Sequence, residues 1–184
     1  MADDQESYAM DYKFNVRKLS KKGQMIKYAA TESERSAIAR DYELLSVEAF
    51  EVECVVAPWK RDGVKLSGAV VASFEQPCAV TAEPLNQVVR EDIDFIYLPE
   101  GSRLLRPPTI EDHELVLDPE GEDMPETFVG DSINLAAAWL ETFALGIDPF
   151  ARIDGAEFAD EGLDRERDSP FSVLANLKTK PKLS

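Results

Sequence analysis

The side chains in this sequence with the widest chemical repertoire are one histidine and two cysteines. His113 lies between Asp112 and Glu114, and a histidine beside carboxylates can act as a general base. A lone histidine in an acidic stretch is usually only solvated, so the sequence indicates no catalytic role for His113. The chain also lacks the G-x-S-x-G, P-loop and G-x-G-x-x-G motifs that position a nucleophile or a phosphate. We therefore expect no catalytic residue and no enzymatic activity.

The two cysteines, Cys54 and Cys78, both lie in apolar patterns typical of strands. Buried free cysteines occur in such positions, whereas a reactive thiolate needs a cationic neighbour or a helix N-terminus. The sequence places neither of these beside Cys78. A structural zinc site usually takes four cysteine or histidine ligands, and the chain has no CxxC pair. The sequence thus predicts no metal site and a reducing compartment.

The charge of the chain is strongly negative. Its 36 Asp and Glu residues outnumber 20 Lys and Arg, which gives a formal net charge of −16. Nucleic-acid affinity depends on neutralising phosphates with Lys and Arg, so this charge favours basic partners over phosphate backbones. The same charge can also serve solubility alone. The N-terminus does not resemble a signal peptide, and no apolar run approaches the roughly 20 residues of a membrane span. We therefore expect a cytoplasmic protein with no membrane partner. We also expect no small-molecule substrate.

The sheet that would position these residues is centred on Val64–Leu98, where apolar and polar side chains alternate. Successive strand side chains point to opposite faces, so the alternation predicts three strands in an antiparallel meander, the middle one at Cys78–Thr81. Two further strands, at 12–17 and 24–29, are expected to form a hairpin, and another strand ends at Pro58. The predicted fold class is α+β, with about six antiparallel strands in a curled or barrel-like sheet.

Two helices are expected to pack on this sheet. The string Thr31–Glu34 has the spacing of a capping box and predicts a helix at about 32–42. The side chains of Asp131 and Ser132 are suitable N-caps for a second helix, whose apolar stripe is typical of a core-facing surface. Gly146 is expected to end that helix at the C′ position.

The chain divides into one domain and two flanking segments. Residues 1–10 are expected to be disordered, and residues 11–153 to form a single α+β domain. Residues 154–184 form a polar C-terminal tail, which we interpret as a linker and a docking segment. Inside the domain, residues 99–130 are rich in proline and acidic side chains and predict a flexible acidic loop, with a short strand at Leu115–Leu117.

Two segments carry candidate partner-binding residues. The first is a basic cluster around the predicted hairpin, which either touches RNA locally or is ordinary charged surface. The second is the tail, where apolar residues at helical spacing precede lysines. It either docks on a partner or packs back on its own domain. The candidate residues are Arg17, Lys18, Lys21 and Lys22 in the cluster, and Pro170, Phe171, Val173, Leu174, Leu177 and Lys178 in the tail.

Several strings, taken in order, also resemble those of a known family. They are Gly68–Ala72, Gln76–Pro84, Asp131–Leu135, Leu145–Arg152 and Ser169–Lys178, and they are spread through most of the chain. In this order and spacing they resemble the YceD family, also called large ribosomal RNA subunit accumulation proteins, and most closely its alphaproteobacterial branch.

This resemblance implies a non-enzymatic cytoplasmic protein that supports accumulation of large-subunit (23S) ribosomal RNA, hence a ribosome-biogenesis factor without a cofactor. Such a factor would bind a basic ribosomal protein or precursor rRNA. Many relatives carry a CxxC pair near Cys78, but Thr81 stands here in the place of the second cysteine. A metal or redox role through that pair is therefore not expected in this chain. The alternative is a general acidic adaptor without a ribosomal role.

Overall fold

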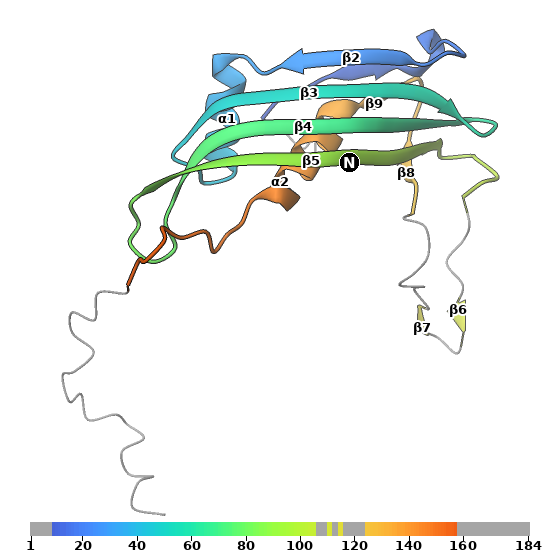
Figure 1. Cartoon of the computed structure of the whole chain (residues 1–184). Coiled ribbons are helices and arrows are strands. Elements are labelled where there is room, and N and C mark those ends of the chain that lie inside the picture. The colour runs from blue at the N-terminus through green and yellow to red at the C-terminus, as the bar shows by residue number, and fades with distance from the viewer. Residues whose placement is uncertain (1–8, 106–109, 112–113, 116–123, 158–184) are drawn as a thin grey trace, which may run out of the picture.

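Three long strands form the centre of the computed structural model, which describes residues 9–105, 110–111, 114–115 and 124–157. They are β3 (Ser46–Trp59), β4 (Gly63–Pro77) and β5 (Pro84–Pro99), and they form an antiparallel meander (Figure 1). The three strands predicted within Val64–Leu98 are only two in the structure, β4 and β5. The expected strand at Cys78–Thr81 is wrong, because these residues form a tight turn between β4 and β5. Within the turn, the N–H of Ala82 donates to the Cys78 carbonyl over 2.9 Å.

Two shorter strands complete the main sheet, whose order is β2-β3-β4-β5-β8. On one side β2 (Gln24–Ala29) pairs antiparallel with β3. On the other side β8 (Glu126–Phe128) runs parallel to the last residues of β5. The sheet is open, so the α+β prediction is confirmed with five strands in the main sheet and without closure into a barrel.

The predicted N-terminal hairpin is wrong. β1 (Lys13–Asn15) pairs with β9 (Ser132–Asn134), far away in the sequence, and the 3-10 turn η1 (Val16–Lys18) leads from β1 towards β2. The alternation of Tyr12, Phe14 and Val16 identified a strand, but it could not identify the partner of that strand. Within the predicted acidic loop, β6 (Ile110–Glu111) pairs with β7 (Glu114–Leu115).

The first helix, α1 (Glu32–Asp41), begins at the capping box that the sequence predicted. The N–H of Thr31 donates to Glu34 Oε2 over 2.8 Å, and Thr31 Oγ1 accepts the N–H of Glu34 over 3.4 Å. Glu34 also accepts the Tyr28 hydroxyl over 2.6 Å. Burial, followed by that hydrogen bond and the charge of Glu34, raises the pKa of Tyr28 to about 12, so Tyr28 remains a donor across the neutral range.

Replacing Thr31 by alanine is expected to lower the free energy of unfolding by about 1 kcal/mol, because the N–H of Glu34 loses its acceptor and Glu34 Oε2 loses the Thr31 hydroxyl donor. The measurement is urea denaturation followed by circular dichroism. The matched control is Thr31→Ser, which keeps the hydroxyl group and should stay close to the wild-type midpoint. Equal losses in the two variants would show that the methyl group of Thr31, and not its hydrogen bonding, is what matters.

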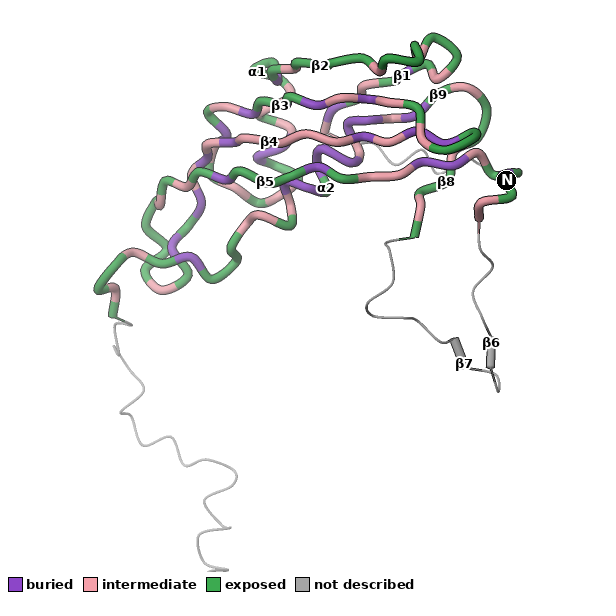
Figure 2. Tube along the Cα trace, turned by 45° about the vertical axis from the view of Figure 1, so that its right-hand side comes forward, coloured by how far each residue is buried: buried purple, intermediate pink, exposed green. Residues whose placement is uncertain are grey.

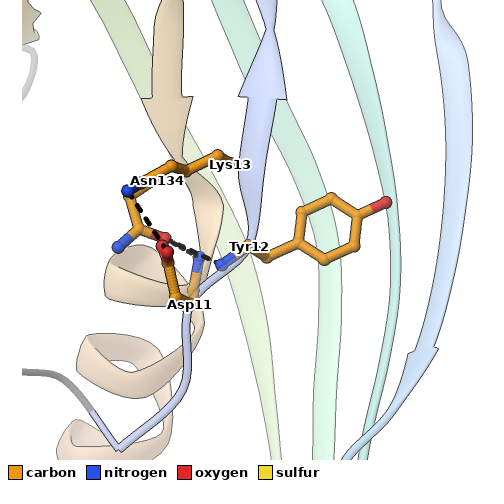
Figure 3. A network of polar contacts seen from close by, with 5 residues as sticks. Asp11, Tyr12, Lys13 and Asn134 are labelled. Carbon is orange, nitrogen blue, oxygen red and sulfur yellow. Dashed lines mark hydrogen bonds and ion pairs between the residues drawn. The ribbon is translucent and has the colours of Figure 1, made fainter.

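The second helix, α2 (Leu135–Gly146), has Asn134 as its N-cap, which lies three residues after Asp131 and two after Ser132, the two N-caps that the sequence predicted. Asn134 Oδ1 accepts the N–H of Ala136 over 3.2 Å and that of Tyr12 over 3.1 Å (Figure 3). One side chain therefore both caps α2 and holds the segment before β1. The residues around Ser132 remain extended because they pair with β1.

Gly146 is the last residue of α2 and does not occupy the left-handed C′ position that we predicted. Its backbone lies against β5 instead. A Cβ at this position would be 2.5 Å from Val89 Cγ1 and 2.7 Å from Glu91 Cγ. A glycine is needed here because the end of α2 approaches the sheet closely, and not because of its backbone angle.

Both helices lie on the same face of the sheet, and the core is enclosed between them and the strands (Figure 1). Along β3 and β4, buried residues alternate with more exposed ones (Figure 2), as the predicted parity requires. The largest fully buried side chains include Trp139 and Phe143 of α2 with Phe50 and Phe74 of the sheet. Met10, in the predicted N-terminal segment, is also buried in this core at 3% exposure.

Candidate interaction surface

The face of the sheet opposite the helices is not covered by any described element. Its side chains come from alternate positions of four strands, and all of them are half-buried or exposed. We call this surface the outer face. Its residues are Met25, Lys27 and Ala29 of β2, Glu51, Glu53, Val55 and Ala57 of β3, Lys65, Ser67, Ala69, Val71, Ser73 and Glu75 of β4, and Val88, Arg90, Asp92, Asp94 and Ile96 of β5.

A shallow hollow of about 710 Å³ lies across the middle of the outer face. Small side chains, including Ala29 and Ala69, line it together with charged side chains such as Glu51 and Arg90. Gly68 also lines the hollow, where β3 and β4 come unusually close together. A surface of this shape can receive a partner segment with protruding side chains, and the charged residues that line it would select the charge of that segment.

Carboxylates outnumber cations on the outer face, even after its ion pairs are formed. Lys27 Nζ lies 3.0 Å from Glu53 Oε1, and Lys65 Nζ lies 2.8 Å from Asp94 Oδ1. Exposed pairs of this kind contribute little to stability, but they neutralise the cations locally. The charges of Glu51, Glu75 and Asp92 are not balanced by any ion pair formed within the described residues. The outer face therefore presents a net negative potential.

The four basic candidates of the first predicted cluster lie together at the turn before β2. Arg17 and Lys18 belong to η1, and Lys21 and Lys22 lie in the turn that Gly23 closes with a φ of +78°. Arg17 is already engaged, because its Nε lies 2.7 Å from Asp131 Oδ1. The three lysines are exposed and form no ion pair in the part of the chain that the structure describes. The cluster is thus a local basic surface on an acidic protein.

The other candidates lie beyond the described residues. The tail set, Pro170, Phe171, Val173, Leu174, Leu177 and Lys178, falls within residues 158–184, and His113 falls within residues 112–113. The predicted disorder of the N-terminus falls mainly on residues 1–8, and most of the predicted acidic loop falls on residues 106–109 and 116–123. These predictions stay predictions.

Cys78 has an environment that the sequence did not indicate. It lies in the β4–β5 turn at 2% exposure, close beneath the surface, and its Sγ accepts the N–H of Ile153 over 3.4 Å. Hydrogen bonds from the Thr81 hydroxyl, from that Ile153 N–H and from the N–H groups of Thr81 and Val80 lower the pKa of Cys78 to about 7. Hydrogen-bond donors around Cys78 Sγ therefore stabilise the thiolate, which we expected to require a cationic neighbour or a helix N-terminus.

Cys54 differs from Cys78 in this respect. It lies inside the sheet at 2% exposure, and burial raises its pKa to about 11. The sequence did not predict this difference between the two pKa values, because both cysteines lie in apolar patterns. One local signal existed, since a threonine three residues after a cysteine can reach its sulfur. The contact with Ile153, which is distant in sequence, left no local signal.

The Cys78 thiol is expected to ionise with a midpoint near pH 7, so its alkylation by iodoacetamide should rise through that range and be slow below it. Because the folded pKa is lowered, the thiolate forms at a lower pH than in an ordinary cysteine. Thr81→Val removes the largest cause of the shift and should move the midpoint upwards. A Cys54→Ser background isolates Cys78, and rates are scaled to each variant's rate at high pH. An identical midpoint in Thr81→Val would contradict the role of the hydroxyl group.

Two further findings concern the described part of the chain. No group of three or more His, Cys, Asp or Glu residues there is arranged to hold a metal ion. Neither α1 nor α2, the helices of that part, has the length and apolarity needed to cross a membrane.

The geometry defines a class of site, namely an open and charged sheet face suited to surface binding. Comparison with models of known protein families, with curated proteins and with solved structures finds no match to this chain in any of the three. The resemblance to the YceD family therefore rests on the sequence strings alone.

Proposed function

We propose that this protein is a non-enzymatic ribosome-biogenesis factor that acts in the cytoplasm. In this proposal it binds a basic ribosomal protein and thereby supports accumulation of large-subunit ribosomal RNA. The resemblance to the YceD family motivates the ribosomal role, and the surface of the molecule motivates the kind of partner.

The observation that carries the proposal is the uncovered outer face with its unbalanced carboxylates Glu51, Glu75 and Asp92. A chain with a formal net charge of −16 attracts basic partners and repels phosphate backbones over most of its surface. An acidic face can shield the basic segments of a ribosomal protein until that protein meets RNA. Binding of this kind requires neither a cofactor nor a small-molecule substrate.

Two of the resembling strings, although far apart in the sequence, support one another in the fold. Gln76 Nε2 donates to the Asp148 carbonyl over 2.8 Å, and the N–H of Ala79 donates to the Ala151 carbonyl over 2.9 Å. The β4–β5 turn is thereby fastened to the segment that follows α2. This contact gives a physical reason why the two strings occur together.

The direct test captures the tagged full-length protein from cells at low and high salt and identifies the material that accompanies it. Large-subunit ribosomal proteins released by high salt are expected, together with reduced 23S rRNA after deletion of the gene. Precursor rRNA that remains after the proteins have been stripped would instead assign binding to the basic cluster, and a combined Lys18, Lys21 and Lys22→Gln variant should then lose it.

A matched pair of variants tests the outer face. Glu51→Lys with Glu53→Lys reverses the charge on β3 and should abolish capture of basic proteins. Glu100→Lys with Glu157→Lys makes the same charge change at exposed positions elsewhere and should leave capture largely intact. If cells lacking the protein keep normal rRNA levels and it captures only unrelated proteins, the ribosomal proposal is wrong and the general acidic adaptor is the better account.

A further inference from the structure

One edge of the main sheet is only partly used. β5 pairs with β4 from Pro84 to Tyr97, but on its other side it pairs with β8 only over Tyr97–Pro99. Figure 1 shows β8 beside that end of β5 alone. No described strand pairs with the remaining edge, between Leu85 and Ile96. A sheet edge with unpaired backbone groups is a template for another strand.

The backbone groups that face this edge can be deduced from the register. The N–H of Cys78 donates to the Glu83 carbonyl over 2.8 Å, and the β4–β5 pairing continues without a shift from Pro84 to Tyr97. Residues of an antiparallel pair alternately bond to the partner strand and face away from it. Odd-numbered residues of β5 therefore bond to β4, and the outward groups between Leu85 and Ile96 belong to Asn86, Val88, Arg90, Asp92, Asp94 and Ile96. The N–H of Glu100 donates to the Phe128 carbonyl of β8 over 3.2 Å, which agrees with this parity.

The edge borders a notch of about 780 Å³ between β5, the segment leading into β8, and α2. Met124 and Leu145 line it with large apolar side chains that are 73% and 81% exposed. Carboxylates line it as well, and none of the ion pairs within the described residues involves them. They are Glu91, Asp92, Glu126 and Glu141.

The two cations of the notch are already engaged. Lys65 Nζ lies 2.8 Å from Asp94 Oδ1, and Lys60 Nζ lies 4.0 Å above the centre of the Trp59 ring. The notch thus combines outward backbone groups, exposed apolar surface and net negative charge. Each of these features would recognise a different part of an extended basic segment.

We propose that the free edge of β5 binds an extended segment of a basic protein, in which lysine or arginine alternates with apolar residues, as an additional strand. This inference rests on the proposed function, because it names where the basic partner docks. A second copy of this chain is a poor occupant. Two β5 edges would bring together Asp92 and its acidic neighbours on chains that each carry a net charge of −16.

The test uses the full chain and a synthetic peptide of about ten residues in which lysine and valine alternate. Asp92→Pro removes the outward N–H without removing a bond to β4, and edge strands tolerate such a proline. Asp92→Ala removes the same charge but keeps the N–H. Unchanged thermal midpoints and circular dichroism show that both variants are folded. A peptide with glutamate in place of lysine controls for charge.

Asp92→Pro is expected to weaken peptide binding by about tenfold relative to Asp92→Ala, which itself binds slightly less tightly than wild type. The glutamate peptide should not bind. In the wild-type protein, the peptide should slow hydrogen exchange at the Asp92 and Asp94 amides. Equal affinity of the proline and alanine variants, or unchanged exchange at those amides, would overturn the inference.

The two proposals fail separately. Failure of the peptide experiment would leave the ribosomal function intact, with the outer face alone as the docking surface. Failure to capture large-subunit components would remove the ribosomal function, while strand addition by a basic peptide could still be measured at the edge of β5.

Discussion

Replacing Phe143 by alanine is expected to lower the free energy of unfolding by about 3–5 kcal/mol. Phe143 is fully buried on α2. The centre of its ring lies 5.6 Å from the ring centre of Tyr42, 5.4 Å from that of Phe50 and 5.5 Å from that of Phe74. Each of the three pairs has an edge-to-face geometry. One truncation therefore leaves a cavity and removes three aromatic contacts, each of which contributes roughly 0.5–1.5 kcal/mol beyond its buried area.

The loss is large because the total stability of a domain is only about 5–15 kcal/mol. Thermal unfolding should show a fall of roughly 6–20 °C in the midpoint. Phe150→Ala is the matched control, since the same atoms are removed from a side chain that is 79% exposed. Its midpoint should hardly change. A Phe143→Ala midpoint close to that of Phe150→Ala would show that α2 does not pack on the sheet through this ring.

The second large effect is expected for Gly68→Ala in the middle of β4. A Cβ at this position would collide with the Glu53 carbonyl oxygen and would lie only 2.5 Å from Cys54 Cα. Both obstacles are backbone atoms of β3, so no side-chain rotation can relieve them. We expect a loss of about 3 kcal/mol in the free energy of unfolding, at the upper end of ordinary overpacking.

Gly101→Ala is a suitable control, because a Cβ there would meet nothing within 4 Å and the backbone angle of Gly101 does not require glycine. That substitution should be neutral or stabilising by up to about 1 kcal/mol. Urea denaturation of both variants gives the comparison. If Gly68→Ala were as stable as Gly101→Ala, the close approach of β3 and β4 at the hollow would be wrong.

Local patterns predicted much of the secondary structure. The alternation in β3 and β4 depends on residues of a single strand. The apolar stripe of α2 and the capping box of α1 depend on residues within a few turns of one helix. Such signals are complete in the sequence, because strand parity and helix capping are properties of short segments. The predictions that failed required knowledge of a partner far along the chain.

The failures share this cause. The strand predicted at 12–17 was expected to pair with the strand at 24–29, its neighbour in the sequence. In the tertiary structure, β1 pairs with β9 instead. That pairing keeps Ser132 extended and moves the N-cap of α2 to Asn134. Cys78–Thr81 has the composition of a strand and forms a turn, because the segment after α2 bonds to it through Ala151 and Ile153. No local pattern records such contacts.

The candidate site divides in the same way. The sequence by itself determined the acidic balance, the positions of the basic cluster, and the residues that alternate on the strands, because charge and parity are properties of composition and order. Only the tertiary structure decided which of these residues stay accessible and unpaired within the described part of the chain. Both helices packed on one face and left the other open, Arg17 was engaged by Asp131, and β8 ended before it covered β5. Burial and strand pairing depend on segments that meet only when the chain folds. The free face, the free edge and the environment of Cys78 could therefore be found only in the tertiary structure.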